Sequence, residues 1–141
     1  MHKPLSTGAT IGILGGGQLG RMLSVAAARL GFRSHIFEPG VACPASHVAD
    51  QLTTASYTDT DALQRFAETV DVITYEFENI PTSALDVLEQ VATIRPGREA
   101  LRISQDRLTE KDFLNSLGLK TAPYAAIDDA PALGAALNAF G

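Results

Sequence analysis

One stretch near the N-terminus decides the fold: TIGILGGGQLG, residues 10–20. The apolar run at 10–14 predicts a buried strand, and the glycines that follow predict a tight turn. Apolar residues then recur at helical spacing and predict an amphipathic helix with an inward apolar stripe. The stripe consists of Leu19, Met22, Leu23, Ala26, Ala27 and Leu30, and Gly31 is placed to end the helix.

The same alternation of strand and helix continues along the chain. Further strands are expected at Arg33–Phe37, Asp71–Tyr75, Ala92–Arg95 and Tyr124–Ile127. Helices are expected at Asp61–Val70, from Pro81, over Arg98–Leu117 with a break near Ser104–Asp106, and at Ala130–Phe140. Residues 41–58 read as irregular. This order predicts an α/β fold, a Rossmann-like parallel sheet with helices on both faces.

Composition narrows the class of protein. The chain has 141 residues, of which 45% are apolar, so it is long and apolar enough to fold around a core. Its net charge of −5 disfavours nucleic acid and anionic membranes as partners. A single cysteine and three scattered histidines offer no zinc site. The opening Met1–Pro4 lacks the pattern of a signal peptide, and we expect a soluble, cytoplasmic protein.

The glycine-rich turn carries the first functional signal. Gly15, Gly17 and Gly20 match G-x-G-x-x-G between a strand and a helix, the context in which backbone amides hold an anion. Glu38 follows about twenty residues after Gly17, where dinucleotide enzymes place the acid that binds a ribose. Spacing alone therefore leaves open an NAD-dependent oxidoreductase, as well as a turn that needs glycine only for its geometry.

Four motifs, in order, point to a particular family. They are GQLGRM at 17–22, CPASHVAD at 43–50, DVITYEFENIP at 71–81 and SQDRLTEK at 104–111. Together they resemble the N-terminal third of N5-carboxyaminoimidazole ribonucleotide synthetases, which belong to the ATP-grasp superfamily. The resemblance covers almost the whole chain.

This resemblance implies a ligase of de novo purine biosynthesis. Such enzymes use ATP, Mg²⁺ and bicarbonate to carboxylate 5-aminoimidazole ribonucleotide, and they are usually homodimers. By this resemblance, residues 1–96 form the Rossmann-like pre-ATP-grasp domain, which helps to hold the acceptor substrate. Residues 97–141 form linker helices and the start of an ATP-grasp domain. The catalytic residues and metal ligands of the family lie outside these motifs, so we expect the 141-residue chain alone not to turn over ATP.

The site residues follow from the resemblance and from position. Gly17, Gln18, Leu19 and Glu76 are expected to bind the ribonucleotide, because a carboxylate at a strand end can accept hydrogen bonds from a ribose diol. The alternative for Glu76 is a carboxylate that only satisfies backbone amides. Arg107 is expected to bind ATP, and its alternative is a solvated ion pair.

Two other functions remain open beside this one. A related ATP-grasp enzyme with another acceptor, such as a formate-dependent glycinamide ribonucleotide transformylase, would be expected to carry Glu where this chain has Gln18. A non-enzymatic binding module also remains compatible with the chain.

Overall fold

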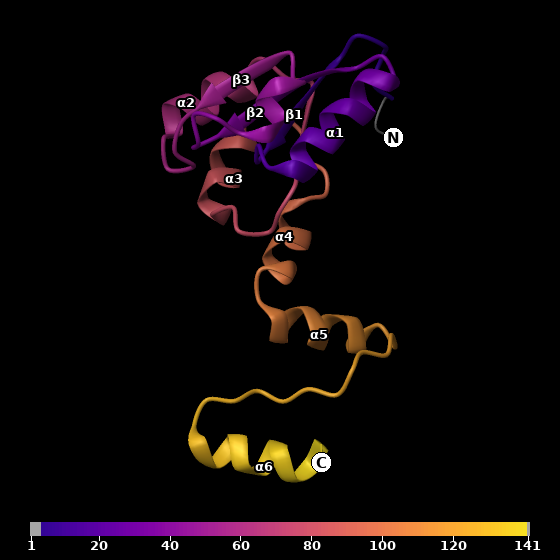
Figure 1. Ribbon diagram of the computed structural model, residues 1–141, viewed down its shortest axis with the longest axis vertical. Coiled ribbons are helices and arrows are strands. Elements are labelled where there is room, and N and C mark those ends of the chain that lie inside the picture. The colour runs from indigo at the N-terminus through magenta and orange to yellow at the C-terminus, as the bar shows by residue number, and fades with distance from the viewer. Residues whose placement is uncertain (1–3, 141) are drawn as a thin grey trace. The chain divides into compact units, whose positions relative to one another are not determined.

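The computed structural model describes residues 4–140 and divides the chain into two compact units, one ending at Leu101 and the other beginning at Arg102. Met1–Lys3, part of the stretch whose sequence does not resemble a signal peptide, lie outside the described residues. Figure 1 traces the elements in chain order. Because the two units are separate bodies, each is described by itself.

The first unit is built on a parallel four-stranded sheet with the order β3-β2-β1-β4. Its strands are β1 (Thr10–Leu14), β2 (Arg33–Glu38), β3 (Gln51–Thr54) and β4 (Val72–Tyr75). Its helices are α1 (Gln18–Arg29), the short 3-10 helix η1 (Pro44–His47), α2 (Thr60–Ala67) and α3 (Thr82–Leu88), and α4 (Arg98–Ser104) begins in this unit and ends in the next. The predicted α/β class is confirmed, and the parallel register aligns Leu14 with both Phe37 and Tyr75.

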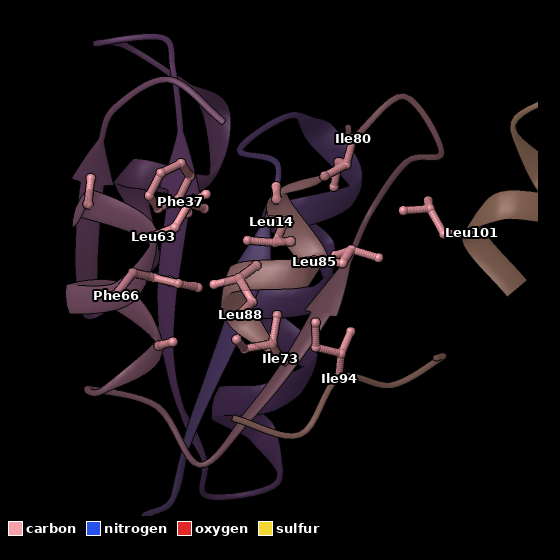
Figure 2. Packing of buried hydrophobic residues seen from close by; sticks show 13 residues of the cluster. Leu14, Phe37, Leu63, Phe66, Ile73, Ile80, Leu85, Leu88, Ile94 and Leu101 are labelled. Atoms are coloured by element: carbon pink, nitrogen blue, oxygen red, sulfur yellow. The ribbon is translucent and has the colours of Figure 1, made fainter. Parts of the chain in front are cut away.

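The main core lies between the sheet and helices α2 and α3. Figure 2 shows this cluster, in which Leu85 and Leu88 of α3 face the sheet residues Leu14 and Ile73. Gly12 of β1 has no side chain, and a Cβ there would stand 2.8 Å from the Phe66 ring, so the glycine lets α2 pack against the strand. Leu101 of α4 is fully buried and closes the cluster.

The opposite face of the sheet carries a smaller cluster under α1 and η1. It consists of Ile13, Ile36, Cys43 and Ala45. Alternation along the strands explains the division, since Ile13 and Leu14 point to opposite faces. Helices therefore cover both faces, as the sequence predicted.

Helix α1 does not bury the stripe that its sequence predicted. Leu19, Met22 and Leu30 are 57%, 59% and 71% exposed. The buried residues of α1 are Gly20, Ser24 and Ala27. A helix that packs closely on a sheet needs small side chains at the contact, so the larger apolar residues lie outside it. Of the predicted stripe only Ala27 is buried, and an inward orientation was wrong for its other members.

Strand boundaries differ from the prediction at three places. Residues 51–54, read as irregular, form β3 at the edge of the sheet. The strand expected at Ala92–Arg95 is reduced to one bridge between Ile73 and Ile94, with backbone hydrogen bonds from Ile73 N to Thr93 O and from Arg95 N to Ile73 O. The strand expected at Tyr124–Ile127 is absent from the described residues, and Tyr124 instead bonds to α5.

The second unit contains α5 (Arg107–Ser116) and α6 (Ala130–Phe140). The expected break before α5 is confirmed, and Asp106 caps the new helix by accepting from the Thr109 amide at 2.7 Å. Gly118 adopts the left-handed conformation that ends α5, with φ of +77°. Neither α5 nor α6 has a buried residue.

Candidate functional site

The candidate site lies at one edge of the sheet, where three parallel strands end. β1 runs into the glycine turn, β2 ends at Glu38, and β4 is followed by Glu76. Parallel pairing places these carboxyl ends side by side, since Leu14 pairs with both Phe37 and Tyr75. The sequence predicted this meeting of Glu76 with the glycine turn.

Glu76 binds the backbone of the turn with both carboxylate oxygens. Its Oε1 accepts from the Gly17 amide at 2.7 Å, and its Oε2 accepts from the Gly20 amide. Its own amide donates to Leu14 O at 3.1 Å, which fixes the start of the segment. Glu76 thus satisfies two amides at the beginning of α1, the structural role that was the alternative at this position. Each oxygen retains a second lone pair for another donor.

Glu38 closes the turn from the other side. Its carboxylate accepts from the Gly16 amide at 2.8 Å and from the Gly40 amide at 3.0 Å. A dinucleotide enzyme would use this acid to hold a ribose. Both of its oxygens bind backbone amides, as those of Glu76 do, so this contact alone does not distinguish a dinucleotide from another ribose ligand.

The three glycines of the motif serve the chain's own carboxylate. Gly15 has φ of +101°, which a side chain rarely tolerates. A Cβ on Gly17 would stand 2.7 Å from Oε1 of Glu76, and one on Gly20 would stand 2.5 Å from the Gly15 carbonyl oxygen. The role of Gly20 in close packing is confirmed. The space at Gly17, expected to admit a ligand, is filled by Glu76.

The electrostatics of the turn follow from these contacts. The N-terminus of a helix carries a partial positive charge that attracts anions. In this chain two carboxylates already lie against it, and they occupy the amides of Gly16, Gly17 and Gly20. The edge therefore presents carboxylate oxygens, which accept hydrogen bonds from hydroxyl or amine groups.

Gln18 and Leu19 stand at the start of α1, beside Glu76's contacts. The helix's own bonding starts at Arg21, whose amide donates to Gly17 O at 3.0 Å. Amides that precede this bond have no carbonyl within the helix to bind. The Leu19 side chain is exposed. The structure thus brings the expected residues Gly17, Gln18, Leu19 and Glu76 together.

Tyr57 belongs to the same edge and was missed by the sequence reasoning. Its hydroxyl donates to Phe37 O at 3.4 Å, and the same oxygen accepts from the Gly15 amide at 3.0 Å. Burial raises the pKa of the phenol, and the charges of Glu38 and Glu76 raise it further, so Tyr57 stays a neutral donor. The only signal in the sequence was an aromatic residue in a stretch read as irregular.

Arg107 lies in the second unit, at the first position of α5. Its guanidinium pairs with Glu110 one turn further on, and its side chain is 79% exposed. It lines a pocket of about 380 Å³ together with Lys111 and Tyr124. The Lys111 ammonium lies 5.0 Å from the centre of the Tyr124 ring, a cation–π contact.

Residues 4–140 offer neither a metal-binding cluster nor a membrane-spanning helix. No group of three or more His, Cys, Asp or Glu side chains in this range is arranged to hold a metal ion. Within the same range, no helix has both the length and the apolar character required to span a bilayer.

Comparison with known proteins identifies close relatives. A family model described as the ribonucleotide synthetase preATP-grasp domain matches residues 8–105. N5-carboxyaminoimidazole ribonucleotide synthase of Brucella melitensis is 55% identical over 97% of this chain and 38% of the relative.

Two solved structures have the same fold. An ADP complex of N5-carboxyaminoimidazole ribonucleotide synthetase matches with a TM-score of 0.89 and 40% identity, over 99% of this chain and 37% of the other. The Aspergillus clavatus enzyme in complex with ADP and 5-aminoimidazole ribonucleotide matches with a TM-score of 0.80 and 29% identity, over 96% of this chain and 37% of the other. The chain thus spans a little over a third of the proteins that it matches.

Proposed function

This chain belongs to the ribonucleotide synthetase preATP-grasp domain family, and from that premise we propose that it is the N-terminal substrate-binding domain of an ATP-dependent ligase. The ligase carboxylates 5-aminoimidazole ribonucleotide, with ATP and bicarbonate, to N5-carboxyaminoimidazole ribonucleotide in purine biosynthesis. The identity of 55% to the Brucella melitensis synthase supports this assignment. We place the preATP-grasp domain at residues 1–96 and the start of the next domain at 97–141.

The observation that carries the proposal is the pair of carboxylates on the glycine turn. Because Glu38 and Glu76 occupy its amides, this edge suits the donor groups of a ribonucleotide better than its phosphate. Glu76 accepts from the ribose hydroxyls with its second lone pairs, and the Gln18 and Leu19 amides bind the sugar's oxygens. The phosphate then requires cations from elsewhere in the enzyme.

Arg107 is proposed to bind a phosphate of ATP. A guanidinium is always charged and offers several donors in one plane, which suits phosphate oxygens. Its exposed pairing with Glu110 is worth little in water and is readily exchanged for a nucleotide. Mg²⁺ has no fitting set of ligands in residues 4–140, so no step is assigned to it through this chain.

The complete enzyme is proposed to work in the cytoplasm as a homodimer. Its partners in the reaction are small molecules, without nucleic acid or membrane. This agrees with the net charge of −5, which repels polyanionic surfaces. The chain supplies no catalytic residue of its own in this proposal.

A chimera tests the proposed function. This chain replaces the matching N-terminal part of the Brucella melitensis synthase, and ATP hydrolysis that depends on 5-aminoimidazole ribonucleotide is measured. We expect turnover by the chimera and none by the 141-residue chain alone. A well-folded chimera without turnover, or turnover by the chain alone, contradicts the proposal.

Two substitutions in the chimera separate the two substrates. We expect Glu76→Ala to raise the KM for the ribonucleotide about tenfold or more, with the KM for ATP nearly unchanged, because a charge-assisted contact is lost. Arg107→Ala should show the reverse pattern. If either variant raised both KM values equally, the role assigned to that residue would be wrong.

A further inference from the structure

The site has a third contributor beside the two carboxylates, and it comes from the end of β3. Tyr57 follows this edge strand, and its partly buried ring packs against the main core cluster. The ring centre is 5.6 Å from that of Phe37 and 6.4 Å from that of Phe77. Tyr57 therefore contacts β2 itself and the segment that follows β4.

The two neighbouring rings are covalently next to the two carboxylates. Phe37 immediately precedes Glu38, and Phe77 immediately follows Glu76. Each ring is therefore one residue away from a carboxylate that binds the glycine turn. The Tyr57 ring packs against both of them.

The hydroxyl of Tyr57 ties this arrangement to the glycine turn. It shares Phe37 O with the amide of Gly15, the first residue of the turn. At 3.4 Å the bond is long, so we expect the ring to contribute more than the hydroxyl.

We propose that Tyr57 is a positioning residue for the ribonucleotide, which holds Glu76 against the glycine turn with its free lone pairs directed to the substrate. This inference rests on the proposed function for the identity of the substrate. Tyr57 itself touches no reacting atom. It acts through the packing of Phe37 and Phe77.

Kinetics of the chimera give the first test. Tyr57→Leu removes the ring, and we expect the KM for 5-aminoimidazole ribonucleotide to rise about tenfold or more, because small displacements of a binding group are costly. The KM for ATP should stay within about twofold. Tyr57→Phe keeps the ring and should restore the ribonucleotide KM to within about threefold of the parent value.

Phe66→Leu is the matched control. Phe66 packs against Phe37 at 5.3 Å but on the side of His35, away from the carboxylates. It is expected to lower stability without raising the ribonucleotide KM. An unchanged KM in folded Tyr57→Leu, or an equal rise in Phe66→Leu, overturns the proposal.

A second test uses the 141-residue chain without substrate. Amide hydrogen exchange of Gly17 and Gly20 is measured by NMR. Tyr57→Leu should lose protection at both amides, whereas Tyr57→Phe and Phe66→Leu should keep it relative to the rest of the sheet. Unaltered protection in Tyr57→Leu refutes the positioning role even if the chimera is inactive, so failure of this inference is distinguishable from failure of the proposed function.

Discussion

A carboxylate that binds the backbone of a distant turn depends on the residues at both ends of the contact. Glu76 reaches Gly17 and Gly20 only because neither carries a side chain in its path. The glycine spacing in the sequence therefore reports on an acid more than fifty residues later. This pairing explains why the motif predicted an anion correctly but left open where the anion comes from.

Gly20 offers a sharp test of this packing. A Cβ there would stand 2.5 Å from the Gly15 carbonyl oxygen, a backbone atom that cannot turn aside. We expect Gly20→Ala to lower the free energy of unfolding by about 1–3 kcal/mol, measured in urea. Gly134→Ala in α6 is the control, since nothing lies within 4 Å of its added methyl group. Equal effects from both changes would contradict the close-packing role.

His35 makes the stability depend on pH. The Thr69 hydroxyl donates to Phe66 O at 2.7 Å, so it accepts from His35 Nδ1–H at 2.9 Å. Nε2 then accepts from the Thr53 hydroxyl at 2.8 Å, which requires a neutral ring. Burial lowers the pKa of His35 below its ordinary 6.5, in keeping with this arrangement.

The sign of the effect follows from proton binding. Between pH 6.5 and the lowered pKa, the unfolded chain binds the proton and the folded chain does not. The contribution of His35 is therefore complete above pH 6.5 and is lost as the pH falls below it. Urea unfolding from pH 7.5 to 5 should show this decline. We expect His35→Gln to flatten it and His47→Gln, at an exposed site, to retain it.

At the scale of elements, the sequence pattern predicted whether a segment is a strand or a helix better than it predicted which face of that segment is buried. β1, β2, β4 and the helices appear where apolar periodicity and glycine placed them. β3 was not predicted, because an edge strand with two threonines is only half-buried and its sequence shows little alternation of apolar and polar residues. The buried face of α1 was predicted only at Ala27, because hydrophobicity marks large side chains, whereas close contact with the sheet also selects Gly20 and Ser24.

Helix α1 can be tested with two opposed substitutions. Ser24→Leu places a larger side chain at a position that is 1% exposed, and we expect a loss of about 1–3 kcal/mol in the free energy of unfolding. Met22→Lys alters an exposed position and should stay within about 0.5 kcal/mol of the parent. The inward stripe that the sequence suggested requires the opposite ranking, so one pair of urea titrations distinguishes the two arrangements.

At the candidate site, too, the sequence predicted the positions of strand ends but not the packing of side chains. Gly17 and Glu76 were predicted to meet because both follow strands of one parallel sheet. Tyr57 could not be found in this way, because its place depends on the missed strand β3 and on ring contacts with Phe37 and Phe77. Strand order places backbone ends, but it does not reveal which side chains pack between them.

At the scale of the molecule, burial is unequally divided. The unit that ends at Leu101 contains both hydrophobic clusters. In the described part of the second unit, α5 and α6 bury no residue, and apolar side chains such as Leu117, Leu137 and Phe140 are exposed. Most of the chain's cooperative stability should therefore reside in the first unit.

Hydrogen exchange measures this division directly. Amides of β1, β2 and β4 should open only with global unfolding, whereas those of α6 should exchange through local opening at a far lower free energy. A chain shortened to residues 1–101 should keep the same protection in its strands. Global protection of α6, or loss of the strands' protection on shortening, would contradict the division.

The carboxylate in the glycine turn also fixes what a common reagent does to this protein. In the parent protein the Glu76 carboxylate already occupies the Gly17 and Gly20 amides, and its negative charge repels inorganic phosphate or sulfate. Glu76→Ala empties two amides at a helix end and creates an attractive hole for either ion. Alanine scanning in phosphate buffer would then report competition by the buffer as well as the lost contact. One residue directly after β4 thus decides whether this turn presents a carboxylate or two free amides to the solvent.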